Sequence, residues 1–300
     1  MSALQQMLLG IAAAAANKKA IFGYGIDDTH SIYYSLTNLV SNTGVVSADV
    51  TGVGTARSDL AAAGYGADKA IFGYGLAGSN VSMTNLVSNA GVVGNDVTGV
   101  GTARWGLAAA GYGTDKAIFG YGYGSSAVSI TNLVSNTGVV STDTTGVGTA
   151  RYYIAATGYG TDKAIFGYGL SGSMTNLVSN TGVVATDTTG VGTSRRTLAA
   201  AGYGTDKAIF GYGYNGINNF SITNLVSNTG VVSTDTTGVG TARRGLAAAG
   251  YGTDKAIFGY GYTTVEVSMT NLVSNTGVVG NDVTGVGTAR YTPAAASYGT

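Results

Sequence analysis

The chain has 300 residues, with 50 Gly, one Pro, one His and no Cys, and its formal net charge is zero with only 10% charged residues. The lack of Cys excludes disulfides and thiolate chemistry, the single His excludes most histidine metal and triad sites, and without a basic run nucleic-acid binding has no electrostatic support. The 44% apolar fraction argues against disorder, and the Gly residues lack the three-residue period of collagen.

The chain opens with an uncharged segment rich in apolar residues, which begins at Met1 and ends at Asn17. It has no positive region before its apolar stretch, as a secretory signal would, and it is too short to cross a bilayer as a helix. We therefore predict no membrane insertion. Residues 1–17 are expected to be a docking or disordered segment, followed by one domain over residues 18–300.

One unit follows six times with little change, at Lys-to-Lys spacings of 50, 47, 47, 44 and 48 residues. Lys-Ala-Ile-Phe-Gly-Tyr-Gly begins at Lys19, Lys69, Lys116, Lys163, Lys207 and Lys255. Thr-Asn-Leu-Val-Ser-Asn begins at Thr37, Thr84, Thr131, Thr175, Thr223 and Thr270. A period in this range, made of short strand-like pieces, predicts a propeller or a solenoid.

Each unit reads as four short strands, in the fifth unit 198–202, 208–212, 223–227 and a last strand from Val231. The Ala-rich first piece is too short and too tightly bounded by Gly to form a helix. In the second piece, alternation predicts Ala208, Phe210 and Tyr212 on one face of the sheet and Ile209 on the other. The Asn-Thr-Gly after the third piece predicts a hairpin.

The two ends of the chain complement each other. Residues 290–299 resemble a first strand with no second strand after it, and residues 20–24 form a second strand with only a degenerate first one at 10–16. We therefore predict an all-β fold: a six-bladed β-propeller of four-stranded antiparallel blades, closed by pairing of the C-terminal strand with the N-terminal blade. Closure protects the sheet edges, which an open solenoid leaves exposed.

The order Arg-x-x-Leu-Ala-Ala-Ala, Asp-Lys-Ala-Ile-Phe-Gly-Tyr-Gly, variable loop and Thr-Asn-Leu-Val resembles a kelch repeat over roughly residues 18–300. The Gly pair of that family is spread out here as Gly-Tyr-Gly, and the late Trp is missing from every copy. The Gly/Tyr-rich units are also similar to repeats of bacteriophage tail-associated and adhesin proteins. The first resemblance implies a propeller used for protein interaction, and the second implies a virion or extracellular location, with the cytoplasm as the alternative.

Variation between the copies is concentrated in two zones. These are the loops between the second and third strands (26–36, 76–83, 123–130, 170–174, 214–222 and 262–269) and the two residues after each repeat Arg. Because strands in a blade run antiparallel, both zones fall on the same face, whereas the nearly invariant loops fall on the other. Eight of the 20 Tyr, the only Trp and the only non-framework Phe lie in these zones.

This inventory predicts a ligand-binding face, because Tyr, Trp and Arg dominate binding hot spots and exposed aromatic rings stack on sugars. The predicted ligand-binding residues are Tyr33, Tyr34, Asp59, Trp105, Tyr123, Tyr152, Tyr153, Arg196, Tyr214, Phe220, Arg244, Tyr262 and Tyr291. The competing interpretation is drift in loops without selection. Drift would favour Ser, Gly and Asn over Tyr and Trp, and it does not explain why the opposite loops barely vary.

Most charges recur once per unit and are expected to be structural. An Arg (Arg57 and its equivalents) and an Asp eight residues before it (Asp49 and its equivalents) flank each connection between units, and a ligand-facing ring of Arg is the alternative. The recurring Asp-Lys pair, such as Asp68 and Lys69, is expected to form a solvated turn.

Enzymatic chemistry finds little support. The Gly-x-Gly patterns end strands instead of opening helices, which excludes dinucleotide and P-loop sites. A glycosidase needs two carboxylates at a set separation, and the non-framework carboxylates are Asp27, Asp28, Asp59 and Glu266. A metal bound by the loop of Asp27, Asp28 and His30 is a weaker alternative, and we predict no catalytic residue, no metal and no cofactor.

The expected function is therefore a non-enzymatic binding module, a phage or virion adhesin or tail-associated protein that recognises a cell-surface glycan or protein. Residues 1–17 would dock on another virion subunit. The alternatives are an intracellular kelch-type interaction domain and a structural or synthetic repeat scaffold.

Overall fold

The computed structural model describes residues 18–27, 32–170 and 172–299, and this part of the chain contains strands and no helix. The segment 1–17 lies outside it. The strands form six three-stranded antiparallel sheets. The strands of each sheet are given from the innermost to the outermost. Sheet 1 consists of β18 (Ala294–Tyr298), β1 (Lys19–Asp27) and β2 (Ile32–Val40); sheet 2 of β3 (Ala61–Tyr65), β4 (Lys69–Leu76) and β5 (Asn80–Val87); and sheet 3 of β6 (Ala108–Tyr112), β7 (Lys116–Gly120) and β8 (Thr131–Val134). Sheet 4 consists of β9 (Ala155–Tyr159), β10 (Lys163–Gly167) and β11 (Thr175–Val178); sheet 5 of β12 (Ala199–Tyr203), β13 (Lys207–Tyr214) and β14 (Asn219–Val226); and sheet 6 of β15 (Ala247–Tyr251), β16 (Lys255–Gly259) and β17 (Thr270–Val273).

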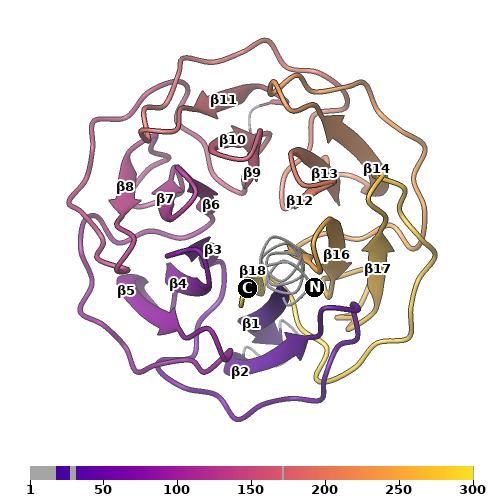
Figure 1. The fold of residues 1–300 in the computed structure, drawn as a ribbon, viewed down its shortest axis with the longest axis horizontal. Coiled ribbons are helices and arrows are strands. Elements are labelled where there is room, and N and C mark those ends of the chain that lie inside the picture. Colours follow the sequence, from indigo (N-terminus) through magenta and orange to yellow (C-terminus); the bar gives the residue numbers. More distant parts are fainter. Residues whose placement is uncertain (1–17, 28–31, 171, 300) are drawn as a thin grey trace, which may run out of the picture.

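The sheets are arranged around a central axis, with their Ala-rich strands innermost (Figure 1). Each innermost strand contacts its two neighbours in the cyclic order β3, β6, β9, β12, β15, β18 and back to β3. Small side chains, mostly Ala and Gly with Thr157 in β9 and Ser297 in β18, leave room for backbones to approach closely at the axis, which explains why a sequence with high helix propensity forms strands here. The arrangement fits a β-propeller-like repeat protein.

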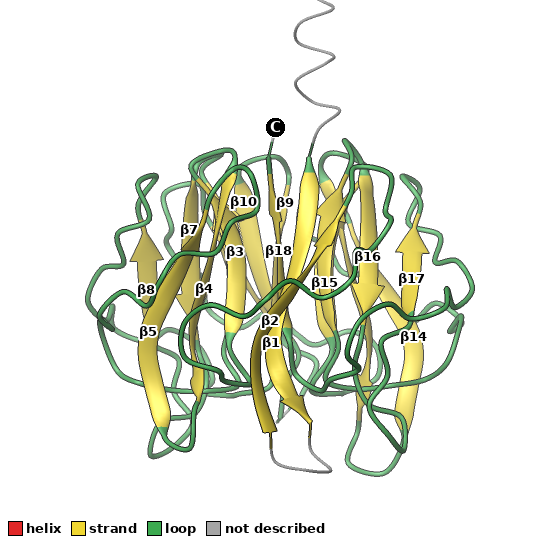
Figure 2. Ribbon diagram, turned by 90° about the horizontal axis from the view of Figure 1, so that it is seen from below, coloured by secondary structure: helices red, strands yellow, loops and turns green. Residues whose placement is uncertain are grey.

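The two ends of the chain meet in sheet 1. Strand β18 pairs antiparallel with β1, from Lys19 opposite Tyr298 to Gly23 opposite Ala294. The same register joins Tyr65 to Lys69 within sheet 2, where a continuous turn connects the two strands. Figure 2 shows the start of β1 and the end of β18 at the same face of the molecule.

This face, which we call the turn face, carries the turns between first and second strands (such as 66–68) and the hairpins after third strands (such as 41–45). The opposite, loop face carries the connections between second and third strands and the two residues after each repeat Arg. On the turn face, a complete cycle of backbone hydrogen bonds of 2.7–2.8 Å joins neighbouring sheets. The N–H donors and carbonyl acceptors are Gly66 to Asp115, Gly113 to Asp162, Gly160 to Asp206, Gly204 to Asp254, Gly252 to Lys18 and Gly299 to Asp68.

The core lies between neighbouring sheets, because both faces of each sheet are covered. Phe210 packs against Tyr168 of sheet 4, with ring centroids 5.1 Å apart, and Ala208 joins the same cluster. Tyr212, however, packs against Phe258 of sheet 6 together with Ile209. The alternation expected for Tyr212 is therefore wrong. Tyr212 has φ 64° and the β13–β14 register shifts between Gly211 and Gly213, so a bulge turns this side chain to the other face.

The sheets have three strands instead of the expected four. The segment after each hairpin pairs with the third strand only at single bridges, in sheet 1 at Val40 with Val46 and at Thr37 with Val50. Between these two bridges, the segment after the hairpin is one residue longer than the third strand, so it forms a bulge. Inside this bulge one backbone bond remains, from the Ser47 N–H to the Leu39 carbonyl at 2.8 Å. Side chains supply the other contacts: the Leu39 N–H donates to the Ser47 hydroxyl at 3.0 Å, and the Asn38 amide donates to the Ser47 carbonyl at 3.1 Å.

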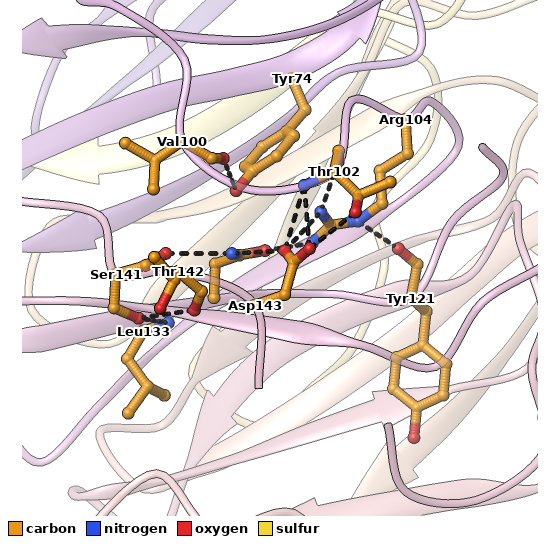
Figure 3. A network of polar contacts seen from close by, with 10 residues as sticks. Tyr74, Val100, Thr102, Arg104, Tyr121, Leu133, Ser141, Thr142 and Asp143 are labelled. Carbon is orange, nitrogen blue, oxygen red and sulfur yellow. Dashed lines mark hydrogen bonds and ion pairs between the residues drawn. The ribbon is translucent and has the colours of Figure 1, made fainter. Parts of the chain in front are cut away.

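The recurring Arg and Asp belong to a buried network that links consecutive units (Figure 3). Arg104 is fully buried; it donates to the carbonyls of Tyr121 at 2.7 Å and Thr102 at 2.9 Å and to the Asn132 amide oxygen at 2.7 Å. Its guanidinium carbon lies 4.4 Å from the centroid of the Tyr74 ring of the preceding sheet. All six repeat Arg are buried in this way, so the alternative of a ligand-facing Arg ring is wrong.

The Asp of the network is held by the incoming chain. Asp143 accepts hydrogen bonds from the Thr102 N–H at 3.0 Å and hydroxyl at 2.6 Å, and from the Asn132 amide at 2.9 Å. Partial burial by itself raises the pKa of Asp143, but these hydrogen bonds outweigh it and hold the pKa below its ordinary value. The expectation of a structural Arg–Asp pair is confirmed, with the two side chains 4.0 Å apart in sheet 3.

Candidate ligand-binding face

All thirteen predicted ligand-binding residues lie in the described part of the chain, and each is partly exposed. Both variable zones lie on the loop face, as the antiparallel order of the strands requires. They are also joined to each other: the residue after the repeat Arg and the residue after Gly-Tyr-Gly exchange two backbone hydrogen bonds. Trp105 and Tyr123 do so at 3.1 and 2.8 Å, and Arg196 and Tyr214 at 2.9 Å in both directions.

Four of the predicted residues form an aromatic cluster across sheets 3 and 4. The Trp105 ring lies 5.4 Å from Tyr123, 5.3 Å from Tyr152 and 5.1 Å from Tyr153, between ring centroids. Tyr152 is 5.0 Å from both Tyr123 and Tyr153. All of these contacts are edge-on or tilted, which is the favoured geometry for aromatic rings, and each of the four residues is partly exposed.

Tyr153 belongs to a belt of backbone near the axis. The belt consists of the second residue after each repeat Arg, and all six members have φ between 46° and 62°. Hydrogen bonds of 2.7–3.0 Å run from the N–H of one to the carbonyl of the preceding one: Gly106 to Asp59, Tyr153 to Gly106, Thr197 to Tyr153, Gly245 to Thr197 and Thr292 to Gly245. The belt holds neighbouring sheets at fixed spacing and thereby orders the side chains of the loop face.

The Tyr153 hydroxyl responds to groups from several sheets. Burial raises the pKa of Tyr153 far above its ordinary value, and the charges of Asp59 and Tyr291 raise it further, whereas Arg196 lowers it. Tyr153 therefore stays a neutral hydrogen-bond donor at any physiological pH.

A second group of predicted residues forms a stack of alternating Arg and Tyr over sheets 5, 6 and 1. The guanidinium carbon of Arg244 lies 4.4 Å from the Tyr214 ring centroid and 4.8 Å from the Tyr262 ring centroid. The guanidinium carbon of Arg196 lies 5.5 Å from the Tyr214 ring centroid. Tyr262 contacts Tyr291, with ring centroids 5.7 Å apart. The aromatic cluster and this stack are adjacent, because the Thr197 N–H next to Arg196 donates to the Tyr153 carbonyl at 3.0 Å.

Three predicted residues stand apart. Tyr33 and Tyr34 pair with Ile26 and Gly25 in the β1–β2 ladder, and Phe220 pairs with Gly213 in the β13–β14 ladder. Within the described residues, none of the three makes a ring contact with the others on the list. The loop of Asp27, Asp28 and His30 falls mostly on residues 28–31, which lie outside the described part.

Sequence reasoning missed two residues that shape the site. Gly245 is required because a Cβ there would collide with the Tyr291 ring, and the Asn219 amide oxygen accepts a hydrogen bond from Arg244 at 3.4 Å. A signal for Gly245 was in the sequence: the second residue after the repeat Arg is Gly in two units and Asp, Tyr or Thr in the other four. That this position takes a left-handed backbone conformation appears only in the structure.

The opposite face differs in chemistry. All seven Lys of the chain lie at the turn face, where each of the five Asp-Lys turns pairs its own charges, for example Lys69 with Asp68 at 3.0 Å. The expectation of a solvated turn pair is confirmed. A cavity of about 300 Å³ along the axis is lined by Ala and Gly of the innermost strands and by turn residues that include Lys116 and Thr161.

Comparisons with known proteins do not assign the chain to a family: no protein-family model matches it, and no curated protein matches it. The described part of the chain contains no helix that is long and apolar enough to cross a membrane. The same residues contain no group of three or more His, Cys, Asp or Glu placed to hold a metal ion.

Proposed function

We propose that the chain is a non-enzymatic binding module that recognises a surface glycan through its loop face. The observation that carries this proposal is the partly exposed cluster of Trp105, Tyr123, Tyr152 and Tyr153, assembled from two sheets on a frame that otherwise repeats. Rings held by their neighbours present large contact area at a low entropic cost, and they suit the apolar faces of sugar rings.

The proposed frame is a closed six-bladed β-propeller of the kelch-like type. The pairing of β18 with β1 and the cycle of hydrogen bonds on the turn face support closure. A propeller of this kind separates framework from specificity, because the buried Arg network recurs in every sheet while the next residue varies. That residue is partly exposed where it is Trp105, Tyr152, Arg196, Arg244 or Tyr291, and it is buried at Ser58.

For the setting we propose a virion or another extracellular surface, with the protein acting as a phage adhesin or tail-associated protein. Its partners would be a cell-surface glycan or protein and, through the segment 1–17, another virion subunit. This part of the proposal rests on the compositional similarity to phage repeats. An intracellular kelch-type interaction domain is the alternative for location.

The test is a glycan array probed with the whole protein and with a Trp105→Ala, Tyr152→Ala variant. We expect the parent to bind a defined set of glycans and the variant to lose at least about tenfold in affinity, because stacked aromatic anchors dominate such sites. Thr137→Ala on the turn face serves as the control and should bind like the parent. Urea unfolding checks that the variants fold.

The absence of glycan binding by the folded parent would overturn the proposal and favour a protein partner. Equal binding by parent and Trp105→Ala, Tyr152→Ala variant would place the site elsewhere.

A further inference from the structure

The Arg–Tyr stack next to the aromatic cluster carries two guanidiniums, on the same face of the molecule as the carboxylates of Asp59 and Glu266. The repeat Arg at positions 195 and 243 are buried and donate to two carbonyls and an amide oxygen each. The next residues, Arg196 and Arg244, are partly exposed instead. Neither forms an ion pair with a carboxylate of the described residues, and the one hydrogen bond from their guanidiniums there is the 3.4 Å contact of Arg244 with Asn219.

Both guanidiniums are nevertheless held in place. Both contact the ring of Tyr214, and Arg244 lies between this ring and that of Tyr262. Their backbones are fixed by paired hydrogen bonds to Tyr214 and Tyr262. Stacking on aromatic faces restrains the guanidinium planes while leaving their edges, which carry the N–H donors, free to bind a planar or tetrahedral anion.

We propose that the loop face recognises an acidic saccharide, whose carboxylate or sulfate group is bound by Arg196 and Arg244 while a neighbouring sugar ring stacks on the cluster of Trp105 and Tyr152. The proposal rests on the glycan-binding function proposed above and names its ligand class. It is supported by adjacency, since Thr197, which follows Arg196, is hydrogen-bonded to Tyr153 of the cluster.

The position of the two Arg in the repeat supports a role in binding instead of folding. They occupy the site that holds Ser58, Trp105, Tyr152 and Tyr291 in the other sheets, and Ser58, Trp105 and Tyr291 form the same paired backbone hydrogen bonds without an Arg. The frame therefore does not require Arg at this position. Its presence in two consecutive sheets concentrates two positive charges at one side of the loop face.

The experiment compares binding of lactose, 3′-sialyllactose and 3′-sulfolactose, together with the neutral and acidic members of the array, to the whole protein and to an Arg196→Gln, Arg244→Gln variant. We expect the parent to prefer acidic glycans and the variant to lose at least about tenfold in affinity for them, a larger loss than for the matched neutral glycans. Binding of acidic glycans should also weaken as salt rises. The sialylated and sulfated probes distinguish carboxylate from sulfate.

A second variant, Arg196→Lys, Arg244→Lys, distinguishes the contribution of the stacked guanidiniums from that of positive charge alone. We expect it to recover less than half of the binding free energy that the Gln variant loses. Parent binding to neutral glycans only, or acidic binding that the Gln variant retains, would overturn the inference and leave the glycan-binding function standing. Failure of the parent to bind any glycan would overturn both.

Discussion

At the scale of single residues, the molecule depends on buried Arg side chains that are held by several hydrogen bonds each. Arg104 has no exposed surface, and its guanidinium makes three hydrogen bonds and contacts the Tyr74 ring. Asn132 is the central connection, because its amide oxygen accepts from Arg104 and its amide nitrogen donates to Asp143 and to the Ser141 carbonyl. A buried charge that loses such a partner is costly because water cannot replace it.

Asn132→Ala is therefore expected to lower the free energy of unfolding by about 3 kcal/mol, since it leaves the Arg104 guanidinium short of an acceptor in a buried site. Urea unfolding followed by circular dichroism measures this loss. Val139→Ala in the same unit is the control, because Val139 is 66% exposed and its truncation should change stability by less than about 0.5 kcal/mol. A loss below about 1 kcal/mol for Asn132→Ala would contradict the role assigned to the network.

At the scale of the element, each second strand owes its place to a Gly that lets the next sheet approach. A Cβ on Gly120 in β7 would lie 2.7 Å from the Phe166 ring of sheet 4 and 3.2 Å from the Thr131 methyl. The following Tyr121 then takes φ 63° and packs against Phe166. Gly and Tyr thus act together, since the Gly admits the neighbouring ring and the bulged Tyr covers it.

Gly120→Ala is expected to destabilise the protein by about 2 kcal/mol through overpacking between sheets 3 and 4. The measurement is again the urea midpoint and slope. Gly124→Ala in the same unit is the matched control, because its nearest contacts would be 3.7 Å away and should cost little. Equal stabilities for the two variants would show that the sheets separate easily at this seam.

At the scale of the whole molecule, the chain ends occupy the place of an ordinary turn. Tyr298 faces Lys19 in the register that Tyr112 and Lys116 share, and Gly299 and Lys18 take part in the cycle of hydrogen bonds on the turn face. Three residues lie between Tyr112 and Lys116, and joining Thr300 to Lys18 would leave the same number between Tyr298 and Lys19. The two chain ends therefore meet at one of six equivalent turn positions.

A circular permutant that begins at Asp115, passes from Thr300 directly to Lys18 and ends at Thr114 is therefore expected to fold, with a free energy of unfolding within about 1 kcal/mol of the linear 18–300 chain. A second permutant opened between Ile165 and Phe166, inside β10, should not fold, because it breaks a fully buried strand. Aggregation of the first permutant under conditions where the linear chain is soluble would contradict the equivalence of the six turns.

The sequence by itself determined the six-fold repeat, the all-β class and the face on which the copies vary. Repetition exposes framework directly, because residues that recur, such as Arg104 and Asp143, must serve the same contacts in every unit. It also indicated which ends of the chain belong together, since a first strand without a second complements a second strand without a first.

Only the tertiary structure decided where individual side chains point and which of them meet. The bulge at Tyr212 reverses its face, and the side-chain bonds of Asn38 and Ser47 replace part of the ladder that would have made a fourth strand. The assembly of Trp105 with Tyr152, and of Arg196 with Arg244 around Tyr214, depends on contacts between sheets. Local spacing along one strand carries no information about such contacts, because they depend on how neighbouring sheets pack around the axis.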